Sequence, residues 1–155
     1  MNPSVELDVR SFLHSSCVDD TYREICMLAG LPRTNRVKLE QKGIVKSQLL
    51  NFQRLIGLEV FTLANIIGIS PRYFYYLNLK DRLSPKAIPR LMAILYLYSD
   101  IYATFDNREY AHIWVSSPAR ELNWEAPVKL MPYMLCHEEI KRFLRQLQNE
   151  KAPLE

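Results

Sequence analysis

The stretch from Leu63 to Pro71 constrains the fold of this chain more than any other. It reads Leu-Ala-Asn-Ile-Ile-Gly-Ile-Ser-Pro, which predicts the end of one helix, a tight turn at Gly68 and the start of a second helix. Ser70 is a good N-cap, because its hydroxyl can accept a hydrogen bond from an amide of the first helical turn. Pro71 then stands at the first helical position, where its missing N–H costs nothing.

Apolar side chains on both sides of Gly68 can pack these two helices against each other. We expect the first helix over 59–67 and the second from 71 to about 79. Two short helices joined by a glycine-containing turn make a helix-turn-helix, the unit that many proteins use to place a helix in the DNA major groove. The apolar residues in question are Leu63, Ile66, Ile67, Ile69, Phe74 and Leu77.

The composition is that of an ordinary globular domain. Of 155 residues, 48% are hydrophobic and 24% are charged, which favours one domain or a small domain with an extension. The longest apolar run, over 91–98, is shorter than the ~20 residues that a membrane span needs. Residues 1–8 lack the basic and apolar regions of a secretory signal. The cysteines, three in number and without paired spacing, favour reduced thiols and a cytoplasmic location.

The net charge of +3 hides an asymmetry along the chain. Residues 1–43 carry no net charge, residues 44–99 carry +5 and residues 100–155 carry −2. The basic surplus therefore falls on the segment that holds the predicted helix-turn-helix. This is the expected direction for a module that faces phosphates.

The N-terminal third predicts a helix, a linker and a second helix. Asp19 or Asp20 can cap a short helix that ends near Gly30, and the polar stretch 34–43 reads as a linker or a loosely structured arm. The apolar pattern that starts at Ser47 predicts a helix closed by Gly57.

The remainder predicts further helices. Ser84-Pro85 repeats the capping signature before a long helix that reaches Phe105, and Pro89 implies that this helix begins late or bends. A helix over 107–116 is expected to bury Tyr110, Ile113 and Trp114. A short helix over 127–135 is interrupted near Pro132, and a last amphipathic helix covers 137–149. Because no segment alternates at period two, the sequence predicts an all-α fold with a helix-turn-helix core and a C-terminal helical region.

From Gly43 onward the chain resembles the Xre/MbcA/ParS-type antitoxins of bacterial toxin–antitoxin operons. The order of several short motifs carries this resemblance, and it covers about two-thirds of the chain. Asn123-Trp124 stand where the family commonly has paired glycines. The matching residues are Leu63-Ala64, Gly68-Ile69-Ser70, Arg82-Leu83-Ser84-Pro85, Ala111, Trp114-Val115, Pro118, Leu122, Pro127 and Leu130-Met131.

The resemblance implies a two-part, dimeric protein that is not an enzyme. A helix-turn-helix region would bind the operon's own promoter DNA. A C-terminal region would bind and block a cognate toxin, usually of the RES-domain type that degrades NAD. The domains would then be a helical extension over 1–42, a helix-turn-helix domain with the long central helix over 43–105, and a toxin-binding region over 106–155.

The candidate DNA-binding residues lie on and after the second helix of the motif. Base edges are usually read by Arg, Lys, Asn and Gln, whereas Tyr contacts phosphate or stacks and discriminates bases less. The tyrosines leave two interpretations open: a DNA reader with reduced or shifted specificity, or a scaffold whose Tyr face meets protein. The candidates are Arg72, Tyr73, Tyr76, Asn78, Lys80 and Arg82.

The candidate toxin-binding residues follow from the resemblance and from Trp124, which could be an interface anchor or a core residue. We expect Trp114 to be a core residue. Tyr96 and Tyr102 exceed one core face of the long helix and are candidates for a dimer contact. The toxin-binding candidates are Trp124, Pro127, Leu130, Met131, Lys141, Arg142 and Arg145.

The sequence offers little for catalysis, and we expect neither a metal nor a cofactor. His14 with Cys17, and Cys136 with His137, have spacings that match no usual zinc site. The alternatives are a stand-alone transcriptional regulator, an interaction scaffold that has lost DNA binding, and a small metal or thiol enzyme.

Overall fold

The computed structural model describes residues 7–151, and within that range it consists of nine α-helices joined by turns and short 3-10 helices, with no strand. The all-α prediction is confirmed for these residues. The expectation about a secretory signal falls mostly on residues 1–6, outside the described range. The helices are α1 (Val18–Met27), α2 (Arg33–Lys42), α3 (Lys46–Ile56), α4 (Val60–Ile67), α5 (Pro71–Tyr76), α6 (Ile88–Thr104), α7 (Arg108–Val115), α8 (Pro127–Leu130) and α9 (His137–Lys151).

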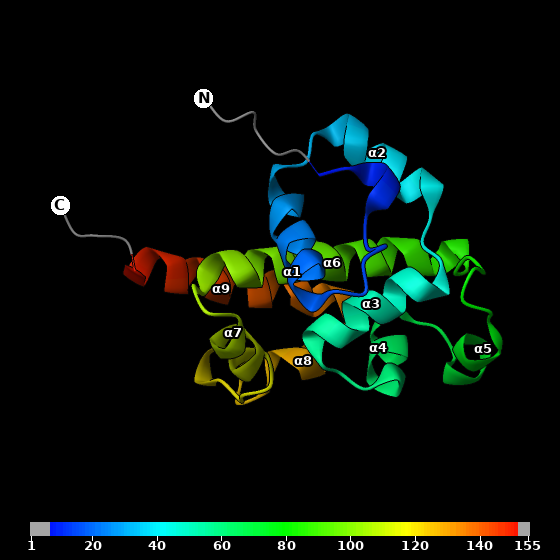
Figure 1. Ribbon diagram of the computed structural model, residues 1–155. Coiled ribbons are helices and arrows are strands. Elements are labelled where there is room, and N and C mark those ends of the chain that lie inside the picture. The colour runs from blue at the N-terminus through cyan, green and yellow to red at the C-terminus, as the bar shows by residue number, and fades with distance from the viewer. Residues whose placement is uncertain (1–6, 152–155) are drawn as a thin grey trace, which may run out of the picture.

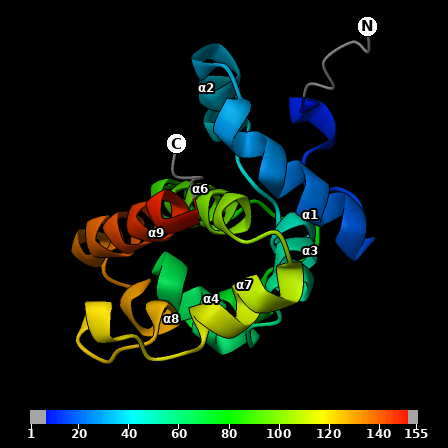
Figure 2. The same cartoon turned by 90° about the vertical axis from the view of Figure 1, so that its left-hand side faces the viewer.

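The long helix α6 runs through the middle of the molecule, and the other helices cover it (Figures 1 and 2). α1, α4 and α9 pack against it, and α2 and α7 contact it as well. Its buried side chains, among them Leu91, Ile94 and Leu97, take up most of its circumference. One stripe, which includes Pro89 and Ala103, is left exposed or half-buried. A helix with so wide an apolar surface must be covered from several sides.

The start of α6 agrees with the position of its proline. A 3-10 turn, Pro85–Ala87, precedes α6, and the Ser84 hydroxyl accepts a hydrogen bond from the Lys86 N–H at 3.4 Å. Pro89 therefore lies in the first turn of α6, where its missing N–H is harmless. At the other end, the Lys151 ammonium of α9 donates to the Thr104 carbonyl at 2.7 Å and so balances the negative end of α6.

The α4–α5 pair forms as its capping residues predict. Gly68 ends α4 with φ +78°, and the Ser70 hydroxyl accepts the Tyr73 N–H at 3.3 Å. The expected end of α5 near residue 79 is wrong, because the chain becomes extended at Leu77. The following loop turns back to α3, where its carbonyls accept the N–H groups of Lys46 and Ser47 at 3.0 Å each.

The first helix begins earlier than predicted. α1 starts at Val18, so Asp19 and Asp20 lie in its first turn and neither is the cap. The Asp20 carboxylate instead accepts the Ser15 hydroxyl at 2.8 Å. Acidic side chains in a first turn still stabilise the helix through its dipole.

The polar stretch over 34–43 is the helix α2, so the linker prediction is wrong. Leu39 is buried, and the Arg36 guanidinium lies 4.8 Å from the centre of the Tyr96 ring. The Arg36 Nε also donates to the Leu31 carbonyl at 3.1 Å. The Tyr96 contact comes from a distant part of the chain, so the polar composition of α2 gave no sign of it.

The segment before α1 is held against the core by two buried amides of α3. Gln48 Nε2 donates to the Phe12 carbonyl and Asn51 Nδ2 donates to the Leu13 carbonyl, each at 2.8 Å. The Leu13 N–H donates to the Glu24 carboxylate at 3.1 Å, and burial raises the pKa of that carboxyl. Residues 7–42 are therefore packed on the rest of the described fold.

The apolar face predicted for α7 is wrong at two of its three residues. Asn107 caps the helix, and Ala111 and Val115 are its buried residues. Tyr110 and Ile113 are 66% and 61% exposed. The helix is rotated so that its small residues approach the core.

Trp114 was expected in the core, and Tyr96 and Tyr102 were expected at a dimer contact. Trp114 is half-buried, with its ring centre 5.4 Å from Phe105 and 5.5 Å from Phe143, so it packs on the core as expected. Tyr102 is 4% exposed, and its hydroxyl lies 2.6 Å from His112 Nε2. Tyr96 is half-buried beneath Arg36. Tyr102 is used inside the fold and is therefore not available for the dimer contact expected of it. For the half-buried Tyr96 the dimer contact stays a prediction.

Within the described range, no helix is long and apolar enough to cross a membrane.

Gly68→Ala is expected to destabilise the protein by more than a backbone effect alone. The left-handed conformation costs an L-residue about 1–2 kcal/mol, and the new Cβ would also meet the Arg90 guanidinium. Gly57→Ala is the matched control, because Gly57 has φ +71° with open space around it. Urea denaturation of both variants measures the difference, and equal losses would contradict the contact with Arg90.

Lowering the pH below about 6.5 is expected to weaken the fold through His112. Burial lowers the pKa of His112 relative to its ordinary value near 6.5, so the folded state favours the neutral ring that accepts the Tyr102 hydroxyl. This stabilisation is present above the unfolded pKa and is lost as the pH falls. The free energy of unfolding, measured by urea between pH 7.5 and 5.5, should depend less on pH in His112→Gln than in the unsubstituted protein.

Candidate functional site

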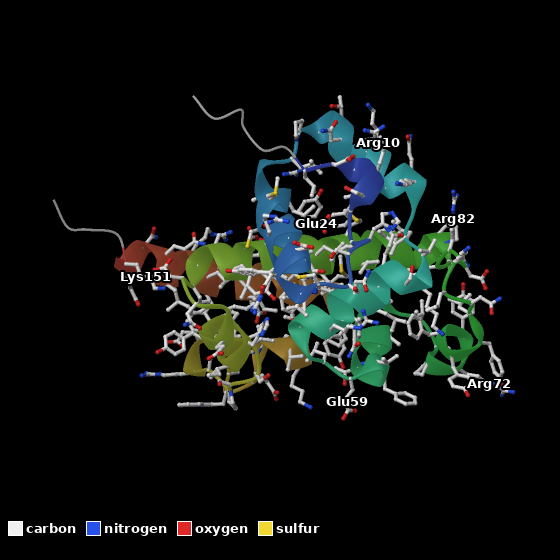
Figure 3. The ribbon with its side chains drawn as sticks, in the orientation of Figure 1. Arg10, Glu24, Glu59, Arg72, Arg82 and Lys151 are labelled. Carbon is white, nitrogen blue, oxygen red and sulfur yellow. The ribbon has the colours of Figure 1, made fainter. Side chains whose placement is uncertain are left out.

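The structure exposes all six predicted nucleic-acid residues on one region of the surface. Arg72, Tyr73 and Tyr76 lie on α5, and Asn78, Lys80 and Arg82 lie on the loop that follows it. Arg72 and Arg82, labelled in Figure 3, lie toward the same edge of the molecule. We call this set the α5 surface.

Aromatic and cationic groups lie beside one another on the α5 surface. The Arg72 guanidinium is 6.0 Å from the centre of the Tyr76 ring, and Tyr75 meets Tyr76 edge to face at 5.5 Å. Tyr76 is 70% exposed. Arg72 and Tyr73 line a shallow depression of ≈ 490 Å³ together with Ser70, Tyr76 and Leu77. Guanidinium and phenol groups of this kind can donate to phosphate oxygens, and the rings can stack on bases.

Hydrogen bonds hold the loop of the α5 surface in place. The Lys46 ammonium donates to the Leu77 carbonyl at 2.9 Å and lies 4.8 Å from the centre of the Phe74 ring. The Asp81 carboxylate accepts the Asn78 N–H at 2.8 Å. The loop therefore presents its side chains from a fixed backbone, although it is polar.

An apolar groove beside α5 was missed by sequence reasoning. Its volume is ≈ 360 Å³, and Phe61, 68% exposed, stands on its rim. Phe61 lies about 200° around the helix from Leu63, so an apolar residue off the core face was the available signal. The lining residues are Lys46, Leu50, Val60, Phe61, Pro71, Phe74 and Tyr75.

A second set of exposed apolar side chains comes from residues 110–135. Leu135 is 93% exposed, and Trp124 is 70% exposed at the tip of a tight turn. In that turn Asn123 and Trp124 have φ +55° and +65°, and the Trp124 N–H donates to the Ala119 carbonyl at 2.8 Å. We call the whole set the C-terminal apolar residues: Tyr110, Ile113, Trp124, Tyr133, Met134 and Leu135.

The predicted toxin-binding residues divide into exposed and buried groups. Trp124 is exposed, so it is not a core residue and is accessible to a partner. Pro127 and Met131 are buried, and Leu130 is half-buried. The expectation that Pro127 and Met131 contact a partner is therefore wrong for this conformation, because they hold α8 against the core. The Met131 carbonyl also lies 2.7 Å from His137 Nε2.

The basic residues predicted on α9 lie at its outer face and beside α6. Arg142 and Arg145 are exposed, and Lys141 is partly exposed, 3.7 Å from Glu138. Burial raises the pKa of Asp100 on α6, and the charges of Lys141 and Arg145 oppose that rise. Arg142 is thus the α9 cation most available to a partner.

The described residues contain no group of three or more His, Cys, Asp or Glu side chains that could hold a metal ion. Cys17 and Cys26 are exposed free thiols, and Cys136 is a partly exposed one. His137, the neighbour of Cys136, is buried with its ring on the Met131 carbonyl.

Comparison of the chain with models of known protein families finds no match, and comparison with curated proteins finds none either.

The two tryptophans are expected to differ in fluorescence. Trp114→Phe leaves the exposed Trp124, which should emit at longer wavelength and be readily quenched by acrylamide. Trp124→Phe leaves the half-buried Trp114, which should emit at shorter wavelength and resist quenching. Identical spectra and quenching constants would contradict the exposed position of Trp124.

Proposed function

We propose that this chain is an antitoxin of the Xre/MbcA/ParS type that binds and neutralises a cognate toxin and regulates its own operon. The motif order from Gly43 onward supports the family assignment. The observation that carries the proposal is the set of C-terminal apolar residues, which are exposed although the chain has a well-buried core. Tyrosine, tryptophan and methionine side chains are enriched in protein–protein interfaces relative to the rest of the surface.

In this proposal the C-terminal region neutralises the toxin by covering the entrance to its active site. Trp124 and Leu135 would be anchors, since large apolar side chains in the centre of an interface contribute most of the binding energy. Arg142, exposed on α9, would contact the toxin electrostatically. The toxin class that the resemblance implies is the RES type, which degrades NAD, and the antitoxin would act in the cytoplasm as a dimer without a cofactor.

Co-expression with the product of the adjacent gene tests the antitoxin proposal. The two proteins should co-purify, and growth should be rescued from the toxin. Trp124→Ala with Leu135→Ala should weaken the complex at least tenfold, because a lost anchor costs about 2 kcal/mol or more. Phe61→Ala with Tyr75→Ala, exposed aromatic residues outside the region, is the matched control. Absence of toxicity and of any complex would refute the proposal.

The α4–α5 pair is proposed as the helix-turn-helix, with α5 facing promoter DNA. Ser70, Pro71 and Gly68 give the local geometry that such a unit needs, and Arg72 and Lys80 supply exposed positive charge. Because α5 presents three tyrosines, most contacts would go to phosphates and only Arg72 and Asn78 would read base edges.

Arg72→Ala with Lys80→Ala is expected to abolish retention of the operon's promoter in a gel-shift assay. Removing two positive charges weakens phosphate contacts, and the loss of Arg72 removes a base reader. Arg120→Ala with Lys129→Ala, also exposed, is the charge-matched control on the C-terminal region. Unchanged retention of the first variant would remove these residues from the DNA site.

A protein-interaction scaffold that has lost DNA binding is the second candidate. The apolar groove beside α5 favours it, because Phe61 and Tyr75 would meet a protein better than a phosphate backbone. A stand-alone regulator without a toxin differs from both in retaining promoter binding while lacking a toxic neighbour.

A further inference from the structure

The helix α2 carries two exposed lysines that make no ion pair among the described residues. Lys38 and Lys42 are exposed and stand four residues apart, so they share one face of the helix. Glu40 lies about 200° around the helix from each of them. Burial raises the pKa of the Tyr96 hydroxyl, and the charge of Glu40 adds a smaller rise. The basic face of α2 is therefore separated from its own acidic residue.

A neighbouring segment adds a third cation to this face. The Lys42 ammonium donates to the Arg10 carbonyl at 2.8 Å, and Arg10 lines a depression of ≈ 610 Å³ together with Lys38 and Lys42. Asp8 lies at the same depression, 3.5 Å from Arg10, and the Arg10 N–H lowers the pKa of its carboxyl. Three cations against one carboxylate leave the depression positive.

The basic face of α2 continues toward the α5 surface. α2 ends at Gly43, where an added Cβ would lie 4.0 Å from the Arg82 side chain, and a backbone bridge pairs Val45 with Arg82. Figure 3 shows Arg10, Arg82 and Arg72 in succession along one edge of the molecule. Positive charge thus extends from α2 across Arg82 to α5.

We propose that the basic face of α2, with Arg10, binds the phosphate backbone of duplex DNA next to the site occupied by α5. This inference rests on the DNA-binding half of the proposed function and gives a role to the N-terminal extension. Lysine ammonium groups on flexible stems neutralise phosphates without reading bases, so this contact adds affinity and salt dependence but no sequence preference.

Fluorescence anisotropy with labelled duplexes tests the proposal. The probes are the operon's promoter and a random-sequence duplex of equal length, each titrated at several salt concentrations. Lys38→Gln with Lys42→Gln should lower the slope of log K against log salt by about two and weaken binding to both duplexes by the same factor. Arg120→Gln with Lys129→Gln, in the C-terminal region, should leave the slope unchanged.

Two further outcomes separate this inference from the proposed function. If the α2 variant keeps the full slope while Arg72→Ala with Lys80→Ala loses promoter binding, the α2 contact is refuted and the DNA-binding function stands. If the unsubstituted protein binds neither duplex, both are refuted. Lys38→Gln alone, at a residue without an ion pair among the described residues, should lower the slope by about one and guards against misfolding of the double variant.

Discussion

The burial of α6 around most of its circumference is the constraint on which the rest of the structure depends. Leu91, Ile94 and Leu97 point in different directions from the helix axis, yet all three are buried. Only one stripe, which includes Pro89 and Ala103, remains exposed or half-buried. Helices on several sides are needed to cover such a surface. The N-terminal helices, α4 and α9 therefore surround α6, and elements from both ends of the chain share one core.

Polar contacts hold the N-terminal segment on this core, and some large apolar side chains lie outside it. α3 holds the N-terminal extension against this core through Gln48 and Asn51, whose buried amides donate to carbonyls of the segment before α1. A buried amide without a partner would be costly, so each pair specifies the position of that segment as well as stabilising it. The large side chains that remain exposed, Trp124 and Leu135 among them, are surplus to a core that is already filled.

The two proposed interfaces lie at different parts of the fold and have different chemistry. The α5 surface joins arginine and lysine to tyrosine, whereas the exposed anchors proposed in the C-terminal region, Trp124 and Leu135, are large apolar side chains. Polyanions and protein partners require these two kinds of surface respectively. A chain that binds both partners at once would need this separation. α6 lies between the two regions, since α4, which packs on α5, and α9 both contact it.

Local signals in the sequence determined the helix ends around the candidate site. Gly68, Ser70 with Pro71 and Asn107 act on neighbours within four residues, so their roles could be predicted without knowing the fold. The six residues of the α5 surface were selected by their position on and after the expected second helix. Their role in binding DNA stays a prediction. The rotation of α7, the folding of α2 and the burial of Tyr102, Pro127 and Met131 were decided only by the tertiary structure. Each depends on a partner from another element, such as Tyr96 for Arg36 or His112 for Tyr102, and periodicity along one helix carries no information about that partner.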